Sequence, residues 1–373
     1  MLNIGFDIRP ALFDYAGIGR YVRELATAIT QLPEEEAVFL QLFAPSWRGG
    51  RRIPPGLAED RHKMNRGWLP GRVMDRLHKL PGLDAGRMPA KVDAFHYTDY
   101  NYPSVRTAGR LLTLHDAAFV AEPKFHGWDT SVLVDRVRDN IQNAHEVLVV
   151  SDPGIRDAEL LGAKRDSIHV IPHGVSPFFK PSTEVCTTAG YLLTVGTLEP
   201  RKNYRRTLKA LEYCWDRDLA PDWVIVGRPG WGYEKFVSEM RNSRHAHRIK
   251  WVQHLTDTEL LRYYQDAMAL LFPSLNEGFG LVVLESMACG TPAIIGNNTA
   301  PAWVAGNSGL RVEATEVDSI AAGIERMVSE SAWRCQASAV AVQRAAEFTW
   351  RETARKTVAA YRRASEAYTA ENS

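Results

Sequence analysis

The chain has 373 residues, of which 45% are hydrophobic and 24% are charged, and its formal net charge is +1. This length favours two domains over one hydrophobic core, and the balanced charge argues against a nucleic-acid-binding protein. The four cysteines form no Cys-x-x-Cys pair, which is typical of reduced thiols rather than of a disulfide framework or zinc site. The first residues read as a strand and not as a signal peptide, and no apolar run reaches the ~18 residues that a membrane span needs. We therefore expect a cytoplasmic protein.

One segment, residues 47–91, departs from this balance. It holds eleven Lys or Arg against four Asp or Glu, and it includes Trp47 and Trp68. Basic segments with interfacial aromatic residues bind anionic bilayers. Peripheral contact with the inner face of the cell membrane is therefore one prediction for this segment, and a solvated, partly irregular surface is the alternative.

Short apolar runs alternate with polar turns and helical patterns along the whole chain. Such continuous apolar strands are buried on both faces, as in a parallel sheet covered by helices. Six runs precede a break at residues 171–181, which contain three prolines and a glycine, and six follow it. The sequence thus predicts two doubly wound α/β domains. The predicted strands are 2–8, 38–43, 92–97, 111–115, 147–151, 168–171, 191–195, 223–226, 249–252, 269–272, 293–295 and 310–312.

Open α/β sheets bind ligands at the carboxyl ends of their strands, and several polar clusters lie there. In the segment that follows strand 269–272, Gly278 and Gly280 let the backbone approach a ligand, and a helix is expected to begin near Leu281. A helix start offers free N–H groups to a phosphate. Glu285 is placed to accept both hydroxyls of a ribose, and Glu277 to point toward a sugar. The alternative is a set of turn glycines with a glutamate that favours a helix start.

A second cluster follows strand 191–195. Gly196 ends this strand, and Arg201 and Lys202 are expected to open the next helix. Two cations at the carboxyl edge of a sheet suit a diphosphate, with Arg binding through its planar fork and Lys as a point charge. Two merely solvated basic residues are the alternative.

Weaker signals lie elsewhere. Gly17 and Gly19 could bring backbone amides near a phosphate or an acceptor, but the third glycine of a dinucleotide fingerprint is missing, so NAD binding is disfavoured. His115 closes a strand and could meet a sugar hydroxyl, help to carry developing charge, or be a satisfied edge residue. His173 is expected to be structural, and His254 with its neighbour Leu255 could line a base pocket.

Several chemistries are disfavoured. The chain has no Gly-x-Ser-x-Gly, no P-loop motif and no His-Glu-x-x-His. His245 and His247 share no ligand spacing with cysteines. The strand-end loops carry no Asp-x-Asp, a motif on which one large class of sugar-transferring enzymes holds a divalent ion. We therefore expect neither a metal ion nor an organic cofactor.

The Glu-x7-Glu pattern from Glu277 to Glu285, preceded by Gly196 and Arg201-Lys202-Asn203, resembles family 4 of the retaining glycosyltransferases, which have the GT-B fold. The resemblance covers residues 170–309. The first half is similar through Gly17-Ile-Gly-Arg-Tyr21 and His115-Asp116, in a form that looks like the subgroup that builds bacterial polysaccharides, often with GDP-mannose. It departs from the family at Ser151-Asp-Pro-Gly154, where a serine-rich start is common, and at His173, where Asn is common.

The resemblance implies roles for these residues. Arg201 and Lys202 would bind the donor diphosphate, and Glu285 would hold the ribose. Glu277, with the backbone of Phe279 and Gly280, would hold the donor sugar. The N–H of Leu281 would bind a phosphate, and Leu255 and Gly278 would line the donor site. His115 would contact the sugar, and Gly17 and Gly19 would lie around the phosphates and the acceptor.

The resemblance also implies the domain roles. Residues 1–173 with 353–373 would form an acceptor-side Rossmann-like domain, and 174–352 a nucleotide-sugar-binding one, with the substrates held between them. The implied activity is retaining transfer of a hexose, favouring a GDP-sugar over a UDP-sugar, to a glycan or lipid-linked oligosaccharide of a cell-surface polysaccharide. Two alternatives stay open: a disaccharide phosphorylase or synthase that acts on small soluble sugars, and a non-catalytic nucleotide-sugar-binding subunit.

Overall fold

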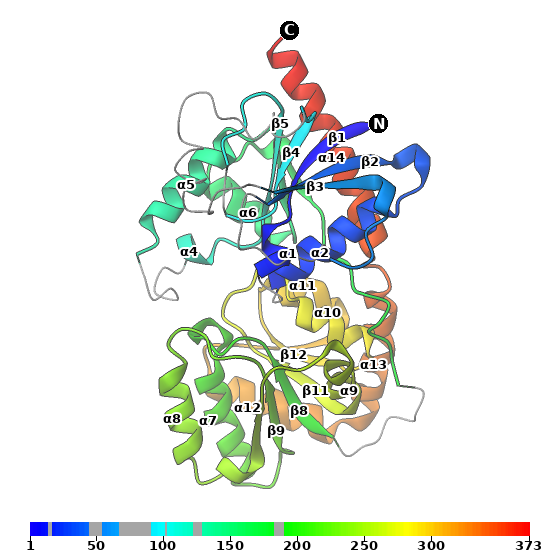
Figure 1. The fold of residues 1–373 in the computed structure, drawn as a ribbon. Helices are drawn as coiled ribbons and strands as arrows, with labels where there is room; N and C mark the ends of the chain where they lie inside the picture. Colours follow the sequence, from blue (N-terminus) through cyan, green and yellow to red (C-terminus); the bar gives the residue numbers. More distant parts are fainter. Residues whose placement is uncertain (14–16, 45–53, 67–90, 101–102, 122–128, 183–189) are drawn as a thin grey trace. The chain divides into compact units, whose positions relative to one another are not determined.

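The chain forms two compact units, each with its own parallel sheet (Figure 1). The first unit consists of Met1–Ala117, Ser131–Gly174 and Thr349–Ser373, and the second of Ala118–Thr130 and Val175–Phe348. The last helix of the chain therefore belongs to the first unit. The structure is a computed structural model, and it describes residues 1–13, 17–44, 54–66, 91–100, 103–121, 129–182 and 190–373.

The first sheet has the strand order β3-β2-β1-β4-β5-β6-β7, and all neighbouring strands are parallel. The six strands that the apolar runs predict are present, with ends that differ by one or two residues. The strands are β1 (Leu2–Asp7), β2 (Val38–Ala44), β3 (His62–Arg66), β4 (Ala94–Tyr97), β5 (Gly109–Leu114), β6 (Glu146–Val149) and β7 (Ile168–Val170).

Strand β3 was not predicted, because His62–Arg66 reads His-Lys-Met-Asn-Arg and lacks an apolar run. It forms the edge of the sheet beside β2, where one side of a strand has no neighbour and polar residues are favoured. This strand lies within the basic segment proposed for membrane contact. Residues 47–53 and 67–90 of that segment, with both of its tryptophans, lie outside the described residues. In the part of the chain that is described, no helix has the length and apolar character that crossing a bilayer requires.

Helices cover both faces of the first sheet. Helices α2 and α14 pack against each other and against β2, β4 and β5, whereas α6 packs on β6 and β7. The approach of α14 to β5 is close, since a Cβ added to Gly109 would lie 2.3 Å from the carbonyl oxygen of Ala364. Among the described residues of this unit, the helices are α1 (Arg9–Phe13), α2 (Gly17–Thr30), α5 (Ser131–Gln142), α6 (Pro153–Leu160) and α14 (Trp350–Glu371).

A buried polar network joins α14 to the sheet. The two ring nitrogens of His96 lie 2.8 Å from the hydroxyl of Tyr361 and 2.8 Å from Oγ1 of Thr113, which in turn lies 2.9 Å from the hydroxyl of Tyr21. His96 is fully buried, and burial, together with the nearby ring of His115, lowers its pKa to about 3. The folded state therefore holds His96 neutral.

This network predicts a loss of stability in mild acid. Below its ordinary pKa of 6.5, His96 binds a proton in the unfolded chain but not in the folded one. Between about pH 6.5 and about pH 3, it should therefore lower the free energy of unfolding by about 1.4 kcal/mol per unit of pH decrease. In His96→Gln this share should disappear, because glutamine does not titrate. Urea unfolding of both proteins at about pH 7 and about pH 5 measures the difference, and equal pH slopes would contradict it.

The second sheet has the order β10-β9-β8-β11-β12-β13 and is also parallel throughout. All six of its strands were predicted. They are β8 (Tyr191–Val195), β9 (Trp223–Val226), β10 (Ile249–Val252), β11 (Ala267–Phe272), β12 (Ala293–Gly296) and β13 (Gly309–Val312). The helices in the described part of the second unit are α4 (Ala118–Ala121), α7 (Tyr204–Trp215), α8 (Tyr233–Asn242), α9 (Asp257–Asp266), α10 (Leu281–Ala288), α11 (Ala300–Ala305), α12 (Val317–Ser329) and α13 (Ser331–Ala345).

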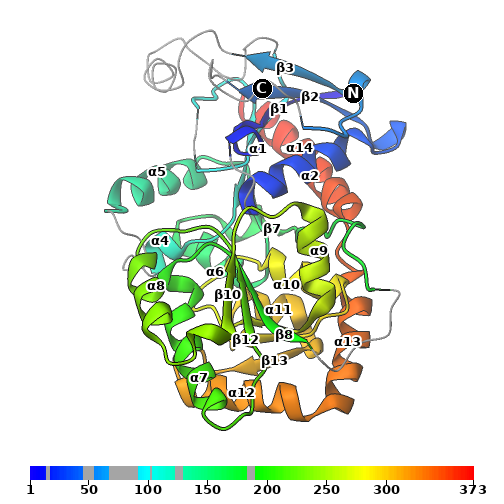
Figure 2. The ribbon, with the colours of Figure 1, turned by 60° about the horizontal axis from the view of Figure 1, so that its bottom comes forward.

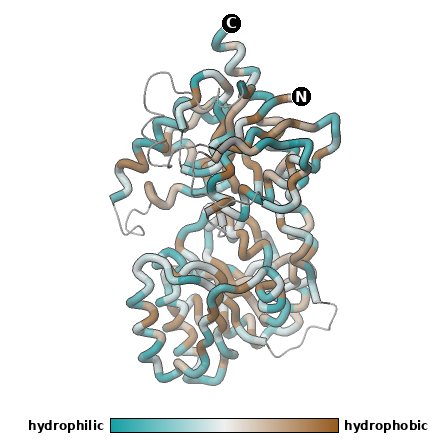
Figure 3. The backbone as a smooth tube through the Cα atoms, in the orientation of Figure 1, coloured by the Kyte–Doolittle hydropathy of each residue, from teal (hydrophilic) through white to brown (hydrophobic). Residues whose placement is uncertain are grey.

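The inner strands of the second sheet, β8, β9, β11 and β12, are buried on both faces, as their apolar runs predict, whereas the edge strands β10 and β13 each have an exposed residue. Alternate residues such as Leu192, Ile225 and Leu271 pack with α7, α8 and α12 in one core cluster. Helices α9 and α10 contact the same sheet through β8, β11 and β12 (Figure 2). Hydrophobic segments gather in the interior of each unit, and hydrophilic ones lie toward its outside (Figure 3). The sheet is therefore rigid, and the loops at its carboxyl edge have fixed starting points.

Candidate active site

The two predicted donor motifs meet at the point where the strand order of the second sheet reverses. The chain runs outward from β8 to β9 and β10, and then returns to place β11 on the other side of β8. Because the connections after β8 and β11 lead in opposite directions, their loops diverge there, which is the usual ligand position in open α/β sheets. Residues 196–203 form the first of these loops, and residues 273–280 form the second.

Four charged side chains from these loops form a cluster, which we name the charge cluster: Glu199, Arg201, Lys202 and Glu277. Oε1 of Glu277 accepts a hydrogen bond from Nζ of Lys202 at 2.5 Å, and its Oε2 lies 2.8 Å from Nη1 of Arg201. Nε of Arg201 lies 2.7 Å from Oε1 of Glu199. The side chains of Lys202 and Glu277 are only 10% and 9% exposed. The cluster therefore holds two cations and two carboxylates, and its formal charge is zero.

Burial and pairing oppose each other in this cluster. Burial alone would raise the pKa of Glu277, but Arg201 and Lys202 outweigh burial and hold that pKa below its ordinary value. Burial lowers the pKa of Lys202, and the attraction of Glu277 offsets part of this effect. The ammonium of Lys202 also lies 4.7 Å from the ring centre of Phe272. Glu277 thus stays ionised between two cations.

Arg201 and Lys202 do not open a helix, contrary to the sequence prediction. Residues Pro200–Lys202 form a single 3-10 turn, and α7 begins only at Tyr204. The residue between them, Asn203, has a φ of 63°, a left-handed conformation that ends the turn. The two cations therefore lie on a loop rather than on a helical face.

The buried side chain of Asn203 fastens this loop. Its Nδ2 donates hydrogen bonds to the carbonyl oxygens of Pro273 and Ala314, at 3.0 Å and 2.6 Å. The backbone N–H of Leu275 donates to the carbonyl of Arg201 at 2.8 Å. These bonds tie the cationic turn directly to the loop that carries Glu277.

Helix α10 begins at Leu281, where the sequence predicts it. Gly280 precedes it with a φ of 100°, and a Cβ at this position would lie 3.0 Å from Cγ of Pro301. Glycine is the residue that this conformation and this space favour. The first N–H groups of a helix have no intrahelical acceptor, so the start of α10 can receive an anion.

Glu285 lies inside α10 and is 5% exposed. Its Oε2 accepts a hydrogen bond from the hydroxyl of Tyr264 at 2.9 Å, and Tyr264 is itself fully buried in α9. This bond orients the carboxylate, which as an ionised group offers several acceptor positions.

The other predicted donor-site residues lie in the same unit. Gly196 ends β8 with a φ of 150°, and its carbonyl accepts a hydrogen bond from the Tyr204 hydroxyl at 2.8 Å. Gly278 is half-buried in the loop after β11.

Phe279 is buried and its ring packs with those of Trp303 and Phe348, so the predicted role falls to its backbone. Leu255 is half-buried and directly precedes the capping box of α9.

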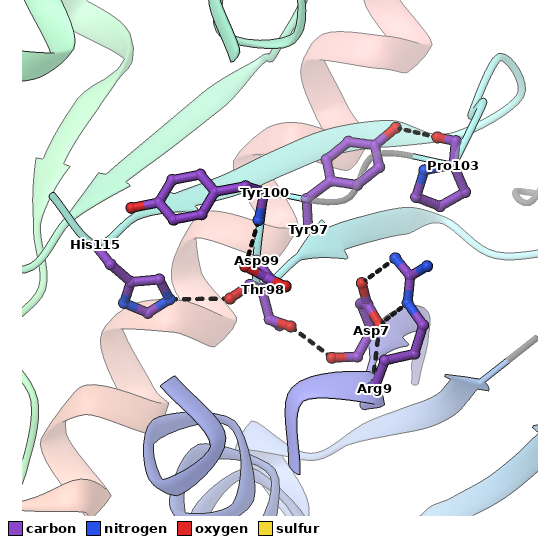
Figure 4. Close-up of polar contacts among 8 residues, drawn as sticks. All are labelled: Asp7, Arg9, Tyr97, Thr98, Asp99, Tyr100, Pro103 and His115. Carbon is purple, nitrogen blue, oxygen red and sulfur yellow. Dashed lines mark hydrogen bonds and ion pairs between the residues drawn. The ribbon is translucent and has the colours of Figure 1, made fainter. Parts of the chain in front are cut away.

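His115 follows β5 in the first unit. Its Nε2 lies 2.9 Å from the carbonyl oxygen of Thr98, as Figure 4 shows. Because a carbonyl only accepts, Nε2 carries the proton, and in the neutral ring Nδ1 is an acceptor. Burial lowers the pKa of His115, which favours this neutral form. The ring of Tyr21 packs edge-on against His115, with 4.8 Å between centroids.

Thr98 also reaches β1, the strand at which the order of the first sheet reverses. Its Oγ1 donates to the carbonyl of Asp7 at 2.5 Å. The buried carboxylate of Asp7 accepts two hydrogen bonds from the guanidinium of Arg9, at 2.8 Å and 2.6 Å (Figure 4). This pair fixes the loop between β1 and α1, and nothing in the sequence pattern singled it out.

The two first-half glycines start a helix. Gly17 and Gly19 lie in the first turn of α2, where Gly17 is exposed and Gly19 is buried. His173 lies in a buried aromatic group, with its ring centre 4.6 Å from that of Tyr21 and 5.9 Å from that of Trp350.

The sequence does contain one Asp-x-Asp, Asp216-Arg-Asp218, which follows α7. It precedes β9 and so lies at the amino end of that strand, away from the carboxyl edge that carries the charge cluster. Asp216 pairs there with His245 at 2.7 Å. Among the described residues, no group of three or more His, Cys, Asp or Glu is arranged to hold a metal ion.

Two members of the site escaped the sequence patterns. Glu199 is two residues before Arg201 in the same strand-end loop, and the charge balance of that loop was the signal that could have found it. Tyr264 lies 21 positions before Glu285 on a separate helix. No local sequence pattern links Tyr264 to Glu285, because their contact depends on how α9 and α10 pack.

Comparison with known proteins agrees with this geometry. Residues 176–347 match the family model "Glycosyl transferases group 1". The chain is 27% identical to O-antigen chain mannosyltransferase B of Escherichia coli, over 97% of this chain and 100% of that protein. It is also 27% identical to D-inositol 3-phosphate glycosyltransferase of Streptosporangium roseum, over 95% and 89% of the two chains.

Solved structures show the same fold. Sucrose-phosphate synthase of Thermosynechococcus elongatus superposes with a TM-score of 0.79 at 18% identity, over 99% of this chain and 100% of that one. Anabaena HepE, solved in complex with UDP and glucose, gives 0.68 at 15% identity, over 96% and 98%. The match at residues 176–347 contains the charge cluster and α10, and the fold extends over both units. The chain is therefore a glycosyltransferase of the GT-B fold, and its residues 176–347 carry the match to the glycosyl transferases group 1 family.

Proposed function

We propose that this glycosyltransferase moves a hexose from a nucleotide diphosphate sugar, of the GDP-mannose type, to a glycan or lipid-linked acceptor in the synthesis of a cell-surface polysaccharide. The observation that carries the proposal is the charge cluster, in which Arg201 and Lys202 pair with Glu277 on the loop that leads into α10. Similarity to an O-antigen chain mannosyltransferase along the full chain supports the choice of mannose and of a polysaccharide product.

The residues that we assign to the donor lie in the second unit. Arg201, Lys202 and the start of α10 at Leu281 would bind the diphosphate, which gains negative charge as the bond to the sugar breaks. These groups can neutralise the leaving diphosphate without a divalent ion. Glu285, oriented by Tyr264, would accept hydrogen bonds from the ribose hydroxyls, and Leu255 would lie near the base.

The sugar itself would contact Glu277, the backbone of Gly278, Phe279 and Gly280, and His115. With its Nε2 proton held by Thr98, His115 would accept a hydrogen bond from a sugar hydroxyl through Nδ1 rather than donate one. We propose retention by same-face attack, in which the acceptor hydroxyl attacks as the diphosphate leaves and its proton passes to a phosphate oxygen.

The proposal also divides the chain by role. Residues 1–173 with 353–373 would serve the acceptor, with Gly17 and Gly19 at the start of α2 near it, and residues 174–352 would serve the donor. Contact of the basic segment 47–91 with an anionic membrane would bring the enzyme to a lipid-linked acceptor.

A thermal-shift panel of GDP, UDP, ADP and CDP tests the donor assignment. A ligand that binds the folded state raises the melting temperature according to its concentration relative to its dissociation constant, and GDP is expected to give the largest rise. In Glu285→Ala this rise should shrink, because the ribose hydroxyls lose their buried acceptor.

Glu239→Ala, which removes an exposed carboxylate on α8, is the control and should respond like the unchanged protein. A larger response to another nucleotide would replace GDP in the proposal. Sugar release that requires inorganic phosphate and no nucleotide would replace the transferase with a phosphorylase.

A further inference from the structure

Glu199 is a charged member of the donor site that takes no part in the role assignments above. It lies outside the Glu-x7-Glu motif, yet its carboxylate is 2.7 Å from Nε of Arg201. Arg201 is consequently shared by two carboxylates, because its Nη1 is 2.8 Å from Glu277. An arginine that is to receive a diphosphate thus has an anionic partner from its own loop.

We propose that Glu199 is an internal competitor of the donor diphosphate, which holds Arg201 before the nucleotide binds and repels the nucleoside diphosphate product afterwards. This inference rests on the proposed function, in which Arg201 binds the diphosphate. It assigns Glu199 to setting the affinity of the site for nucleotide and the rate at which product leaves.

The local backbone supports this assignment. Glu199 precedes the Pro200–Lys202 turn in an extended conformation, and its carbonyl accepts the N–H of Lys202 at 3.1 Å. Because the backbone is fixed in this way and Pro200 follows, the carboxylate can leave Arg201 only by rotation of its own side chain.

The carboxylates of Glu277 and Glu199 differ in role because they pair with different numbers of cations. Glu277 contacts both cations and is 9% exposed, whereas Glu199 makes its ion pair with Arg201 alone and is 16% exposed. With Glu199 present the charge cluster is neutral, and without it the cluster would carry one positive charge toward a multiply charged anion. At a separation of several ångströms in partly buried surroundings, one such charge changes anion affinity by several-fold.

The matching experiment is Glu199→Gln. Glutamine keeps an oxygen that can accept from Nε of Arg201, so the geometry is retained while the charge is removed. Isothermal titration calorimetry with GDP is expected to give a dissociation constant lower by roughly threefold to tenfold, and inhibition of turnover by GDP should strengthen by the same factor. Binding of unphosphorylated guanosine should not change, because it lacks the diphosphate.

Two further variants make the result decisive. Glu239→Gln changes the net charge by the same amount at a carboxylate that pairs with Arg205 and lies outside the charge cluster, and it should leave GDP affinity unchanged. Glu199→Ala removes both charge and contact, and it should also tighten GDP binding. Circular dichroism and the melting temperature report whether each variant is folded.

The outcomes separate the two proposals. Unchanged or weaker GDP binding in both folded Glu199 variants would overturn the inference, since Glu199 would then support Arg201 instead of competing for it. If none of the four nucleoside diphosphates of the panel binds the unchanged protein, the proposed function fails. If one other than GDP binds, the same titration is made with that nucleotide and its nucleoside.

Discussion

Replacing Lys202 by Met is expected to lower turnover by about 10²–10³-fold, because the enzyme then lacks a cation where charge develops on the leaving diphosphate. The side chain is 10% exposed and lies over the ring of Phe272, so a methionine of similar length keeps the apolar contact while removing the ammonium. Glu277 retains Arg201 as a partner in this variant. The measurement is kcat with saturating nucleotide sugar, alongside the unfolding transition.

Lys235→Met is the matched control, since Lys235 is exposed on α8 outside the charge cluster. It should retain full turnover. Undiminished kcat in folded Lys202→Met would remove Lys202 from the stabilisation of the leaving group.

Glu277→Gln is expected to lower turnover by about 10²-fold while nucleoside diphosphate affinity stays equal or increases. The reason is that Glu277 is assigned to the donor sugar, whereas its present partners, Arg201 and Lys202, are assigned to the diphosphate. The amide loses the charge-assisted hydrogen bonds to sugar hydroxyls and, at the same time, weakens the hold of residue 277 on two cations, of which Arg201 keeps Glu199 as a partner. Turnover and calorimetric GDP binding are measured on the same preparation.

A parallel loss of turnover and of GDP affinity in this variant would contradict the assignment of Glu277 to the donor sugar. Glu277 would then serve to position the two cations, and the donor sugar would be held by other groups. Glu325→Gln, at a carboxylate on α12, is the control and should change neither quantity.

The overall architecture could be predicted because it depends on a signal that every strand carries. A parallel strand covered on both sides reads as an unbroken apolar run, and twelve such runs identified twelve of the strands within two residues. Strand β3 was missed for the same reason, since an edge strand such as His62–Arg66 needs no apolar run. The start of α10 was also predictable, because glycine before an apolar helical pattern marks that boundary.

The internal arrangement of the site was less accessible. The sequence identified Arg201, Lys202 and Glu277 as candidates, but not their pairing, which requires the loops after β8 and β11 to lie side by side. Their placement on a helix was wrong, because the left-handed conformation of Asn203 depends on acceptors at Pro273 and Ala314, far along the chain. The tautomer of His115 likewise depends on Thr98, in a different strand-end loop.

The return of α14 to the first unit has a consequence for the order in which a newly made chain can fold. Tyr361 and Ala364 of α14 pack on a sheet whose strands come from residues 2–170, so that sheet is covered only after residue 364 has been synthesised. The segment from Val175 to Phe348 has its own strands and covering helices at an earlier stage. The segment from Val175 to Phe348 is therefore synthesised before the helix that covers the first sheet, and a chain released near residue 349 is expected to fold its second unit while the first sheet stays open to chaperones.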